Sequence, residues 1–341
     1  MTTKSKNKNI VIGIAYNAYD PLTARKVERA SEESVEEMAN EVLAAVTELG
    51  YTSFTLPLHK SFLSFLNRLK VLNADVIINL CEAFAGYPQL ESNVAAAFEL
   101  MGVAFTGNDS RTLALCLNKF RTKAVLKSSG LPTAPAMLMD SPDAKPEIPF
   151  PVIVKPNRED ASLGILPESV CADVEALQKQ VQRIIEIYDQ SALVEAYIDG
   201  REFNVAVFDD AKPEALPVSE IDFSQMPEGQ ARILSYEAKW LADGVLYQAS
   251  PPVCPAPIDD AVRTKLQEMA VKAFLAVECR DYGRIDFRMD KKGRIFVLEV
   301  NPNPDISLNA GYARALGAAG IEYKAFWQRL IEKALARRPK K

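Results

Sequence analysis

Histidine and paired cysteine are nearly absent from this sequence. His59, within LPLHK, is the only histidine in 341 residues, which excludes a histidine-based catalytic triad or a metal centre with several histidine ligands. We expect His59 itself in a surface loop. The five cysteines are scattered and include no CxxC pair, so reduced thiols in a cytoplasm are expected rather than a disulfide framework or a zinc site.

Long apolar runs and basic clusters are also missing. No stretch approaches the roughly eighteen apolar residues that a membrane-spanning helix needs, and the run Ile10–Ala15 is too short for the core of a signal peptide. The net charge is −5 with both signs interspersed, whereas a phosphate-reading surface needs clustered Lys and Arg. We therefore expect a cytoplasmic protein without a membrane or nucleic-acid partner.

The composition that remains, 48% hydrophobic and 25% charged, is ordinary for a globular protein of two or three domains. In the first part of the chain, apolar strands alternate with amphipathic helices, which predicts a parallel α/β domain. A dinucleotide-binding domain is the competing interpretation, but the turn after the first strand holds only Gly13 and lacks GxGxxG. The expected strands are Ile10–Ala15, Asp75–Leu80 and Val103–Phe105, and the expected helices are Ser34–Leu49 and Ser92–Leu100.

The clearest pattern in the chain is a β-hairpin within Arg284–Pro304. Two runs of alternating apolar residues flank the turn-forming tetrapeptide Asp290–Gly293. A turn that pairs Asp290 with Gly293 would place Asp286 opposite Val297 and diagonal to Glu299. The same register would place Arg284 directly opposite Glu299.

Asp286, Glu299 and Asn301 share one face of this hairpin, near enough to bind a common divalent ion. Their carboxylate and amide oxygens are hard ligands of the kind that Mg²⁺ prefers. The alternative is a half-exposed hairpin with a charged outer face. The metal site is favoured because Glu299 interrupts the apolar strand IFVLEV, where an unpaired carboxylate is costly, and because Asn-Pro-Asn-Pro ends that strand just beyond it.

Two lysines and a loop suggest a phosphate site in the middle of the chain. Lys119 lies in a helix predicted over Leu113–Ser129, and Lys155 ends the strand PVIVK. A loop of small residues, Arg158–Gly164, follows. A lysine and such a loop can grip a phosphate, although a lysine that snorkels beside a polar hairpin loop gives the same pattern.

Further acidic residues border apolar strands later in the chain. Glu195 is embedded in the strand Ala192–Ile198, and Glu202 precedes the strand Phe203–Phe208, which indicates either a pocket or capped turns. The Pro-rich segment 222–257 contains SYEAKW and predicts a lid, with a disordered loop as the alternative. Helices are expected at Leu177–Tyr188, Asp259–Val277 and Tyr323–Ala336.

Taken together, these stretches resemble the ATP-grasp enzymes, and specifically the D-alanine–D-alanine ligase branch. The matching segments are FTGNDSRTLALCLNKFRTK, GLPTAP, PVIVKPNRED, LVEAYIDGREFNVAV, SYEAKW, CPAPI, YGRIDFRMD and GRIFVLEVNPNP, in the order of the family. The resemblance implies an α/β (α+β) ATP-grasp fold with three domains. These are an N-terminal α/β domain (1–110), a central ATP-grasp subdomain (111–195) and a C-terminal subdomain with the Mg²⁺ site and the lid (196–341).

The resemblance also implies a role for each candidate residue. Arg284 would stabilise an acyl-phosphate and the oxyanion, and Lys239 would reach the γ-phosphate. The expected ATP-binding residues are Lys119, Lys155, Ser162, Glu195, Ala196, Tyr197, Ile198, Glu202 and Lys239. The expected ligands of Mg²⁺ (or Mn²⁺) are Asp286, Glu299 and Asn301. The expected substrate-binding residues are Glu33, Tyr236 and Asp305.

The amino-acid half of the site departs from the family pattern. The family's first-substrate signature is absent, since Ala30–Val35 reads ASEESV. Ala161 replaces a serine of the phosphate loop, Trp240 stands where the family has a tyrosine, and Ala310–Gly311 replace a Ser-Leu pair. Asp305 replaces the glycine of NPGM and would repel a substrate carboxylate. We therefore expect a cationic or uncharged amine as the acceptor rather than D-alanine.

The sequence thus predicts an ATP- and Mg²⁺-dependent ligase that joins a small-molecule carboxylate to a small-molecule amine through an acyl-phosphate. A true D-alanine–D-alanine ligase of cell-wall precursor synthesis is one alternative. A non-catalytic nucleotide-binding protein is another, but it has no need for a full set of phosphate-binding cations. A homodimer is the assembly that the resemblance implies.

Overall fold

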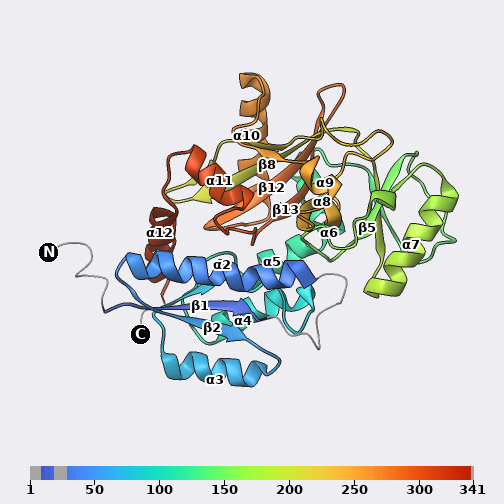
Figure 1. The fold of residues 1–341 in the computed structure, drawn as a ribbon. Helices are drawn as coiled ribbons and strands as arrows, with labels where there is room; N and C mark the ends of the chain where they lie inside the picture. Colours follow the sequence, from blue (N-terminus) through green and yellow to red (C-terminus); the bar gives the residue numbers. More distant parts are fainter. Residues whose placement is uncertain (1–8, 19–28, 339–341) are drawn as a thin grey trace.

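The structure is a computed structural model that describes residues 9–18 and 29–338, with the side chains of residues 29–33 outside the description. Within these residues the strands form three sheets (Figure 1). One sheet lies in the N-terminal part of the chain, one in the middle, and the largest in the C-terminal part. The helices pack against the faces of these sheets.

The N-terminal sheet is parallel, as the alternation of strands and helices predicts, and has the order β2-β1-β3. The expected strand Val103–Phe105 is reduced to a single bridge between Ile77 and Phe105. The sequence pattern does not reveal β2, which contains a proline and stays half-buried along most of its length. The strands are β1 (Val11–Asn17), β2 (Thr52–Leu58) and β3 (Val76–Asn79).

Gly13 is a packing glycine in the middle of β1. A Cβ atom at this position would lie 2.7 Å from Ile77 Cδ1 and 3.1 Å from Phe54 Cζ. A side chain would therefore collide with both neighbouring strands. This close packing explains a lone glycine here without any dinucleotide-binding motif.

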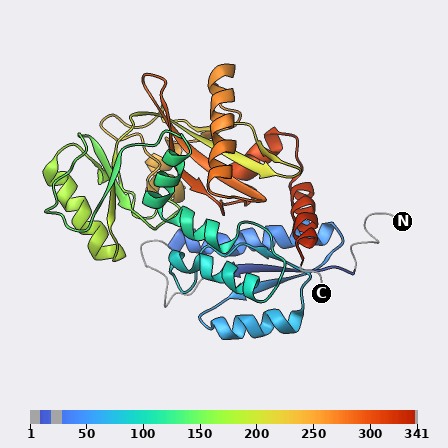
Figure 2. The ribbon, with the colours of Figure 1, turned by 180° about the vertical axis from the view of Figure 1, so that it is seen from behind.

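Four helices cover the two faces of the N-terminal sheet (Figure 2). One face carries α2 (Arg29–Glu48) together with the last helix of the chain, α12 (Tyr323–Ala336). The opposite face carries α3 (Phe62–Leu72) and α4 (Glu91–Leu100), the latter preceded by the short turn η1 (Pro88–Leu90). The C-terminal helix thus completes the core of the N-terminal part.

Ion pairs fasten the end of the chain to this core. The Arg337 guanidinium pairs with both carboxylate oxygens of Asp281, at 2.6 Å each, and donates to the Phe105 carbonyl. Arg338 binds Asp75 at 2.7 Å. Two-point pairing by arginine fixes orientation as well as distance, so α12 has a defined position against the sheet.

The central sheet is antiparallel and has the order β4-β7-β5-β6. Helix α7 (Val174–Tyr188) covers one face of it with a buried apolar stripe. The strands are β4 (Ala136–Met139), β5 (Val152–Pro156), β6 (Val170–Cys171) and β7 (Ala192–Ala196), and a short turn, η2 (Pro167–Ser169), precedes β6.

The C-terminal sheet is also antiparallel, with the order β11-β10-β8-β12-β13 and β9 paired to β8. Its strands are β8 (Gly200–Asp209), β9 (Pro213–Ala215), β10 (Ser219–Ile221), β11 (Pro252–Val253), β12 (Tyr282–Asp290) and β13 (Ile295–Asn301). Helix α10 (Asp260–Ala276) packs on one face with α5 (Ser110–Leu117) and α6 (Lys119–Ser128). Helix α11 (Gly311–Ala318) packs toward α12.

The helix expected over Leu113–Ser129 is broken in two at Asn118. Asn118 has φ −86° and ψ 90°, and its side chain accepts a hydrogen bond from the Arg121 backbone N–H at 3.1 Å. It therefore ends α5 and caps the N-terminus of α6. This break makes Lys119 the first residue of a new helix.

The expected hairpin is present, but its predicted register is wrong. Asp286 lies opposite Glu299, and Arg284 lies opposite Asn301. A β-bulge between Asp286 and Phe287 leaves Leu298 without a partner and restores the pairing of Phe287 with Val297. The extra residue reverses the alternation, so that both Val297 and Val300 face the core. The two acidic side chains are thereby directly opposite instead of diagonal.

The segment 222–257 is folded. It contains two short helices, α8 (Tyr236–Trp240) and α9 (Val245–Gln248), followed by β11. In the part of the chain that the structure describes, no helix is both long enough and apolar enough to cross a membrane.

Candidate active site

A cavity of about 680 Å³ lies between the central sheet, the C-terminal sheet and the segment 222–257. This size is in the usual range for small-molecule sites. Lys119 and Tyr236 are not among the residues of its wall. Most of the other residues predicted from the sequence are: Lys155, Ser162, Glu195, Ala196, Tyr197, Ile198, Glu202, Lys239, Arg284, Asp286, Glu299, Asn301 and Asp305.

Asp286 is the most heavily bonded acid of the cavity. Its Oδ1 accepts from Asn204 Nδ2 at 2.8 Å, and its Oδ2 accepts from Asn301 Nδ2 at 3.0 Å. Arg284 donates to the same two oxygens through Nε at 2.8 Å and Nη2 at 2.7 Å. Burial alone would lower the pKa of Arg284, but Asp286 raises it. Arg284 is therefore held as a cation on the cavity wall.

Glu299 faces Lys119. Lys119 Nζ lies 3.4 Å from Glu299 Oε2 and 3.1 Å from Asp160 Oδ1, and it also donates to the Glu159 carbonyl. Burial alone would raise the pKa of Glu299, but Lys119 and Lys155 outweigh burial and lower it to about 2. Glu299 is thus an ionised carboxylate at neutral pH, with Lys119 behind it rather than on the cavity wall.

Asp286, Glu299 and Asn301 fit a divalent cation by their chemistry. Among the residues that the structure describes, no group of three or more Asp, Glu, His and Cys side chains lies close enough to hold a metal ion. The candidate set instead combines two carboxyl groups on opposed strand positions with one amide oxygen. All three are hard oxygen donors, as Mg²⁺ requires.

Lys155 and Glu195 form an ion pair on the cavity wall. The second oxygen of Glu195 pairs with Lys123 of α6 at 2.5 Å. Burial would raise the pKa of Glu195, but Lys123 and Lys155 lower it. The Glu195 carboxylate is therefore directed at two lysines, while the backbone of the residues after it lines the cavity.

Glu202 is buried against Arg288, with Oε2 and Nη2 2.7 Å apart. Burial raises the pKa of Glu202 in spite of this arginine. Arg288 also lies 6.0 Å from the centre of the Tyr197 ring and 5.4 Å from that of Phe223. Arg288 holds Glu202 in place at the cavity wall.

The loop 158–164 is bonded to the segment that follows β10. Ala161 and Ser162 have positive φ angles of 54° and 61°, an arrangement that turns backbone groups toward a common point. Trp240 Nε1 donates to the Ala161 carbonyl at 2.9 Å, and Ser162 Oγ donates to the Leu234 carbonyl at 2.9 Å. The Tyr236 N–H donates to the Ile165 carbonyl at 2.9 Å. These hydrogen bonds connect the predicted lid, within 222–257, to the loop 158–164 and Ile165.

Lys239 projects from this lid. It lines the cavity together with Arg284, and its Nζ lies 5.2 Å from the centre of the Trp240 ring. Burial lowers the pKa of Lys239, and Arg284 lowers it further. An anion that enters the cavity would therefore stabilise the charged form of Lys239.

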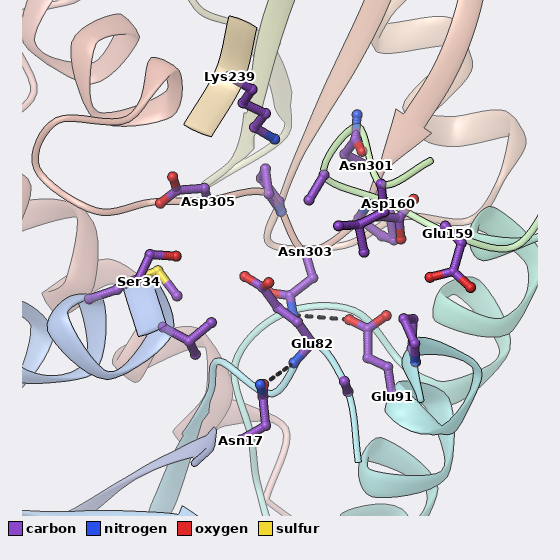
Figure 3. Close-up of a pocket in the computed structure, with 18 of the residues that line it drawn as sticks. Asn17, Ser34, Glu82, Glu91, Glu159, Asp160, Lys239, Asn301, Asn303 and Asp305 are labelled. Carbon is purple, nitrogen blue, oxygen red and sulfur yellow. Dashed lines mark hydrogen bonds between the residues drawn. The ribbon is translucent and has the colours of Figure 1, made fainter. Parts of the chain in front are cut away.

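A smaller chamber of about 100 Å³ adjoins the main cavity and shares Lys239, Arg284 and Asp305 with it. Its remaining walls are strongly acidic (Figure 3). Asn303 Nδ2 donates to Glu91 Oε1 at 3.0 Å, and Asn17 accepts from the Glu82 backbone N–H at 2.8 Å. The acidic residues around this chamber are Glu82, Glu91, Glu159, Asp160 and Asp305.

Glu82 and Glu91 hold protons more tightly than usual. Burial, together with Asp305 and Asp160, raises the pKa of Glu82 to about 8 against the opposing effect of Lys239. Burial also raises the pKa of Glu91 well above its usual range. A cationic group in this chamber would stabilise the ionised form of both carboxylates.

The predicted substrate residues have different outcomes. Asp305 lines both chambers, and its Oδ1 accepts from the Ser307 N–H at 2.9 Å. Tyr236 lies in α8 away from the cavity wall. The Glu33 side chain is outside the described residues, although Ser34, next to it in α2, lines both chambers.

Several residues of the site escape the sequence analysis. In the sequence, Lys123 is one of many polar residues in a predicted helix. Arg288 has the pattern of an ordinary solvent-facing residue of the hairpin. Glu82 and Glu91 belong to a loop and a helix start in the N-terminal part, far in sequence from the hairpin. One signal was present for Arg288: it shares the strand face of Arg284 and Asp286.

Comparisons with known proteins agree with this geometry. The sequence profile of the family described as "D-ala D-ala ligase C-terminus" matches residues 125–332. An uncharacterized protein y4sG of Sinorhizobium fredii is 34% identical over 87% of this chain and 87% of its own length. A D-alanine–D-alanine ligase of Alcanivorax borkumensis is 32% identical over 72% of this chain and 73% of its own.

A solved structure has the same fold. The D-alanine–D-alanine ligase of Bacillus anthracis complexed with ATP superposes with a TM-score of 0.75, at 19% identity, over 96% of this chain and 98% of the other. The expected α/β (α+β) architecture, with a parallel N-terminal sheet and two antiparallel sheets, is confirmed.

Proposed function

Because this chain belongs to the D-alanine–D-alanine ligase family of ATP-grasp proteins, we propose that it is an ATP-dependent ligase that joins a small carboxylic acid to an amine. ATP phosphorylates the acid to an acyl-phosphate, and the amine displaces the phosphate. The product is an amide.

The convergence of cations on one cavity carries this proposal. Lys155, Lys239 and Arg284 line the cavity wall, and Lys119 lies behind Glu299. Transfer of a phosphoryl group spreads negative charge over the oxygens that move, and fixed cations stabilise that charge. A protein that bound only the base of a nucleotide would not need this group of four cations.

Each part of the cavity has a role in this reaction. Lys155 binds phosphates, and Lys119 adds positive charge to the phosphate site from behind Glu299. The loop 158–164 with Ser162 covers the phosphates, and Lys239 reaches the transferred group from the lid. Asp286, Glu299 and Asn301 hold Mg²⁺ (or Mn²⁺), which supplies charge neutralisation when bound. Arg284 stabilises the acyl-phosphate and then the oxyanion. The adenosine lies against Glu195 to Ile198, with Glu202 at the ribose.

The acceptor in this proposal is an amine that is cationic or uncharged, rather than an amino acid held by its carboxylate. The support is the acidic chamber beside Arg284, to which Glu82, Glu91 and Asp305 contribute. An ammonium group would shift Glu82 and Glu91 toward their ionised form and pair with it, whereas a substrate carboxylate would shift them toward the neutral form.

The test of the reaction is phosphate release from ATP and Mg²⁺ with pools of amino acids and amines. One well contains D-alanine alone, and the Glu299→Gln variant is the blank. Turnover with amine pools and not with D-alanine supports the proposal. Turnover driven by D-alanine alone would instead identify a D-alanine–D-alanine ligase, the activity that several curated relatives bear in their names.

The acceptor hypothesis predicts the effect of Asp305→Gly. We expect the KM for the true amine acceptor to rise about tenfold, because a hydrogen bond to a charged group is lost, while the KM for ATP stays within about twofold. Steady-state kinetics with each substrate varied in turn measures the two KM values separately. An unchanged KM for the amine would contradict the hypothesis.

The pH dependence offers a second test of the acceptor. Because the pKa of Glu82 is raised to about 8, Glu82 is neutral below that pH and ionised above it. The KM for a cationic amine should therefore fall several-fold between about pH 7 and pH 9. Glu82→Gln should remove this change and leave only the titration of the amine itself. A profile that is identical in both proteins would remove Glu82 from the acceptor site.

We further propose the domain division at residues 110 and 195, a homodimeric assembly and a cytoplasmic location. Size-exclusion chromatography with light scattering measures the assembly directly.

A further inference from the structure

Two lysines share one carboxylate beneath the wall of the main cavity. Lys123 on α6, Lys155 on β5 and Glu195 on β7 are 2%, 5% and 1% exposed. Lys155 and Glu195 line the cavity, whereas Lys123 is not among the wall residues. Lys123 therefore reaches the site only through Glu195.

The contacts within this trio are electrostatic. Glu195 Oε1 lies 2.5 Å from Lys123 Nζ, and Oε2 pairs with Lys155 Nζ. Among the described residues, neither Lys123 Nζ nor Glu195 Oε1 has a hydrogen-bond partner in good geometry. The short distance and the poor angle together define an ion pair. Burial and Lys155 lower the pKa of Lys123, against the opposing effect of Glu195.

The charges of the trio leave one positive charge in excess. A single carboxylate can neutralise one ammonium group, and here it faces two. In a buried place such an excess charge is costly until an anion compensates it. Lys155 is the member with access to the cavity, where it already lowers the pKa of Glu299, so the excess charge is available to anions there.

We propose that Lys123 is a positioning residue for nucleotide binding: by occupying one oxygen of Glu195, it leaves the charge of Lys155 available to the phosphates of ATP. Lys123 does not touch the nucleotide. This inference rests on the proposed function, in which Lys155 binds phosphate. Without Lys123, Glu195 and Lys155 would form a closed neutral pair, and the attraction for phosphate would weaken.

The first experiment compares nucleotides with different numbers of phosphates. Wild-type protein and Lys123→Met are titrated with adenosine, ADP and ATP in competition with a fluorescent ATP analogue. We expect the Kd for ATP to rise roughly tenfold or more in the variant, as for loss of one charge-assisted contact. The Kd for adenosine should stay within about twofold. Lys127→Met, at an exposed lysine one turn along the same helix, should change neither value.

A second variant separates charge from packing. The double variant Lys123→Met/Glu195→Gln removes one positive and one negative charge and again leaves Lys155 unpaired. Because Glu195 also borders the adenosine site, the readout is the ratio of the Kd for adenosine to the Kd for ATP, which we expect to return to within about threefold of wild type. Lys123→Arg, which keeps the charge, should also keep the wild-type ratio. A structural role for Lys123 would instead leave the double variant with the ratio of the single one.

The outcomes are distinct from those that test the reaction. The inference is overturned if the wild-type protein binds ATP and Lys123→Met keeps the wild-type ratio of adenosine affinity to ATP affinity. This holds whether both affinities stay unchanged or both fall by the same factor. If the wild-type protein binds no ATP, the proposed function fails, and this inference fails with it.

Discussion

Glu299→Gln is expected to reduce ATP-dependent phosphate release roughly a thousandfold, since loss of a metal ligand removes several kcal/mol of charge stabilisation. Glu299 is ionised at neutral pH because nearby lysines hold its pKa at about 2. The amide has the same shape but no charge, so it weakens the cation site and leaves Lys119 with Asp160 as its remaining carboxylate partner.

The fold should tolerate this change. The Glu299 side chain is 26% exposed, so the melting temperature should stay close to that of the wild-type protein. Glu214→Gln is the matched control, because Glu214 pairs only with an exposed lysine at the far end of the sheet. A Glu299→Gln variant that kept more than about a third of the wild-type turnover would contradict the proposed metal site.

Arg284→Met should lower kcat by about 10²–10³-fold, the usual cost of removing one donor that stabilises developing negative charge. The KM for ATP should change only a few-fold, because the other phosphate-binding lysines remain. Asp286 keeps its hydrogen bonds from Asn204 and Asn301, so the site is expected to stay folded. Single-turnover kinetics, which separates binding from chemistry, measures this difference.

Two further variants sharpen the test of Arg284. Arg284→Lys retains a charge but cannot form the two-point contact with Asp286, and we expect partial activity. Arg294→Met removes an exposed arginine beside the hairpin turn and should behave as wild type. If Arg284→Met lowers kcat by less than about fivefold, Arg284 is not the residue that stabilises the oxyanion.

The hairpin illustrates what a sequence alone can reveal. Alternation of apolar and charged residues placed Asp286, Glu299 and Asn301 on one face, and the structure brings these side chains to one cavity wall. The register could not be predicted, because the bulge at Leu298 depends on packing against the core. Val297 and Val300 both fill that core, and no local signal distinguishes this from simple alternation.

The acidic chamber could not be predicted for a different reason. Glu82 and Glu91 come from the N-terminal part, Asp160 from the central sheet region, and Asp305 from the segment after β13. Asp305 was expected near the acceptor and Asp160 lies in the loop 158–164, but Glu82 and Glu91 have no informative neighbour in the sequence. Only the packing of the three parts against each other brings their carboxylates together, and this packing is set by contacts of long sequence separation.

The departures from the family pattern are clearer in three dimensions. Trp240 bonds to the Ala161 carbonyl, and Ser162 bonds to the Leu234 carbonyl. The segment 222–257 and the loop 158–164 are thus connected through Ala161 and Trp240, two positions at which the sequence departs from the family pattern. The sequence alone did not indicate that these two residues contact each other.

The position of α12 also has a consequence for how this protein is made. One face of the N-terminal sheet packs against α2 and also against Phe326, Trp327, Leu330 and Ile331 of α12, which follow both antiparallel sheets in the chain. Domains generally fold in the order of their synthesis, but the part of this face that α12 covers stays exposed until both antiparallel sheets have been made. A ribosome that stalls before α12 would therefore hold a chain with part of an apolar sheet face exposed, a substrate for chaperones and proteases.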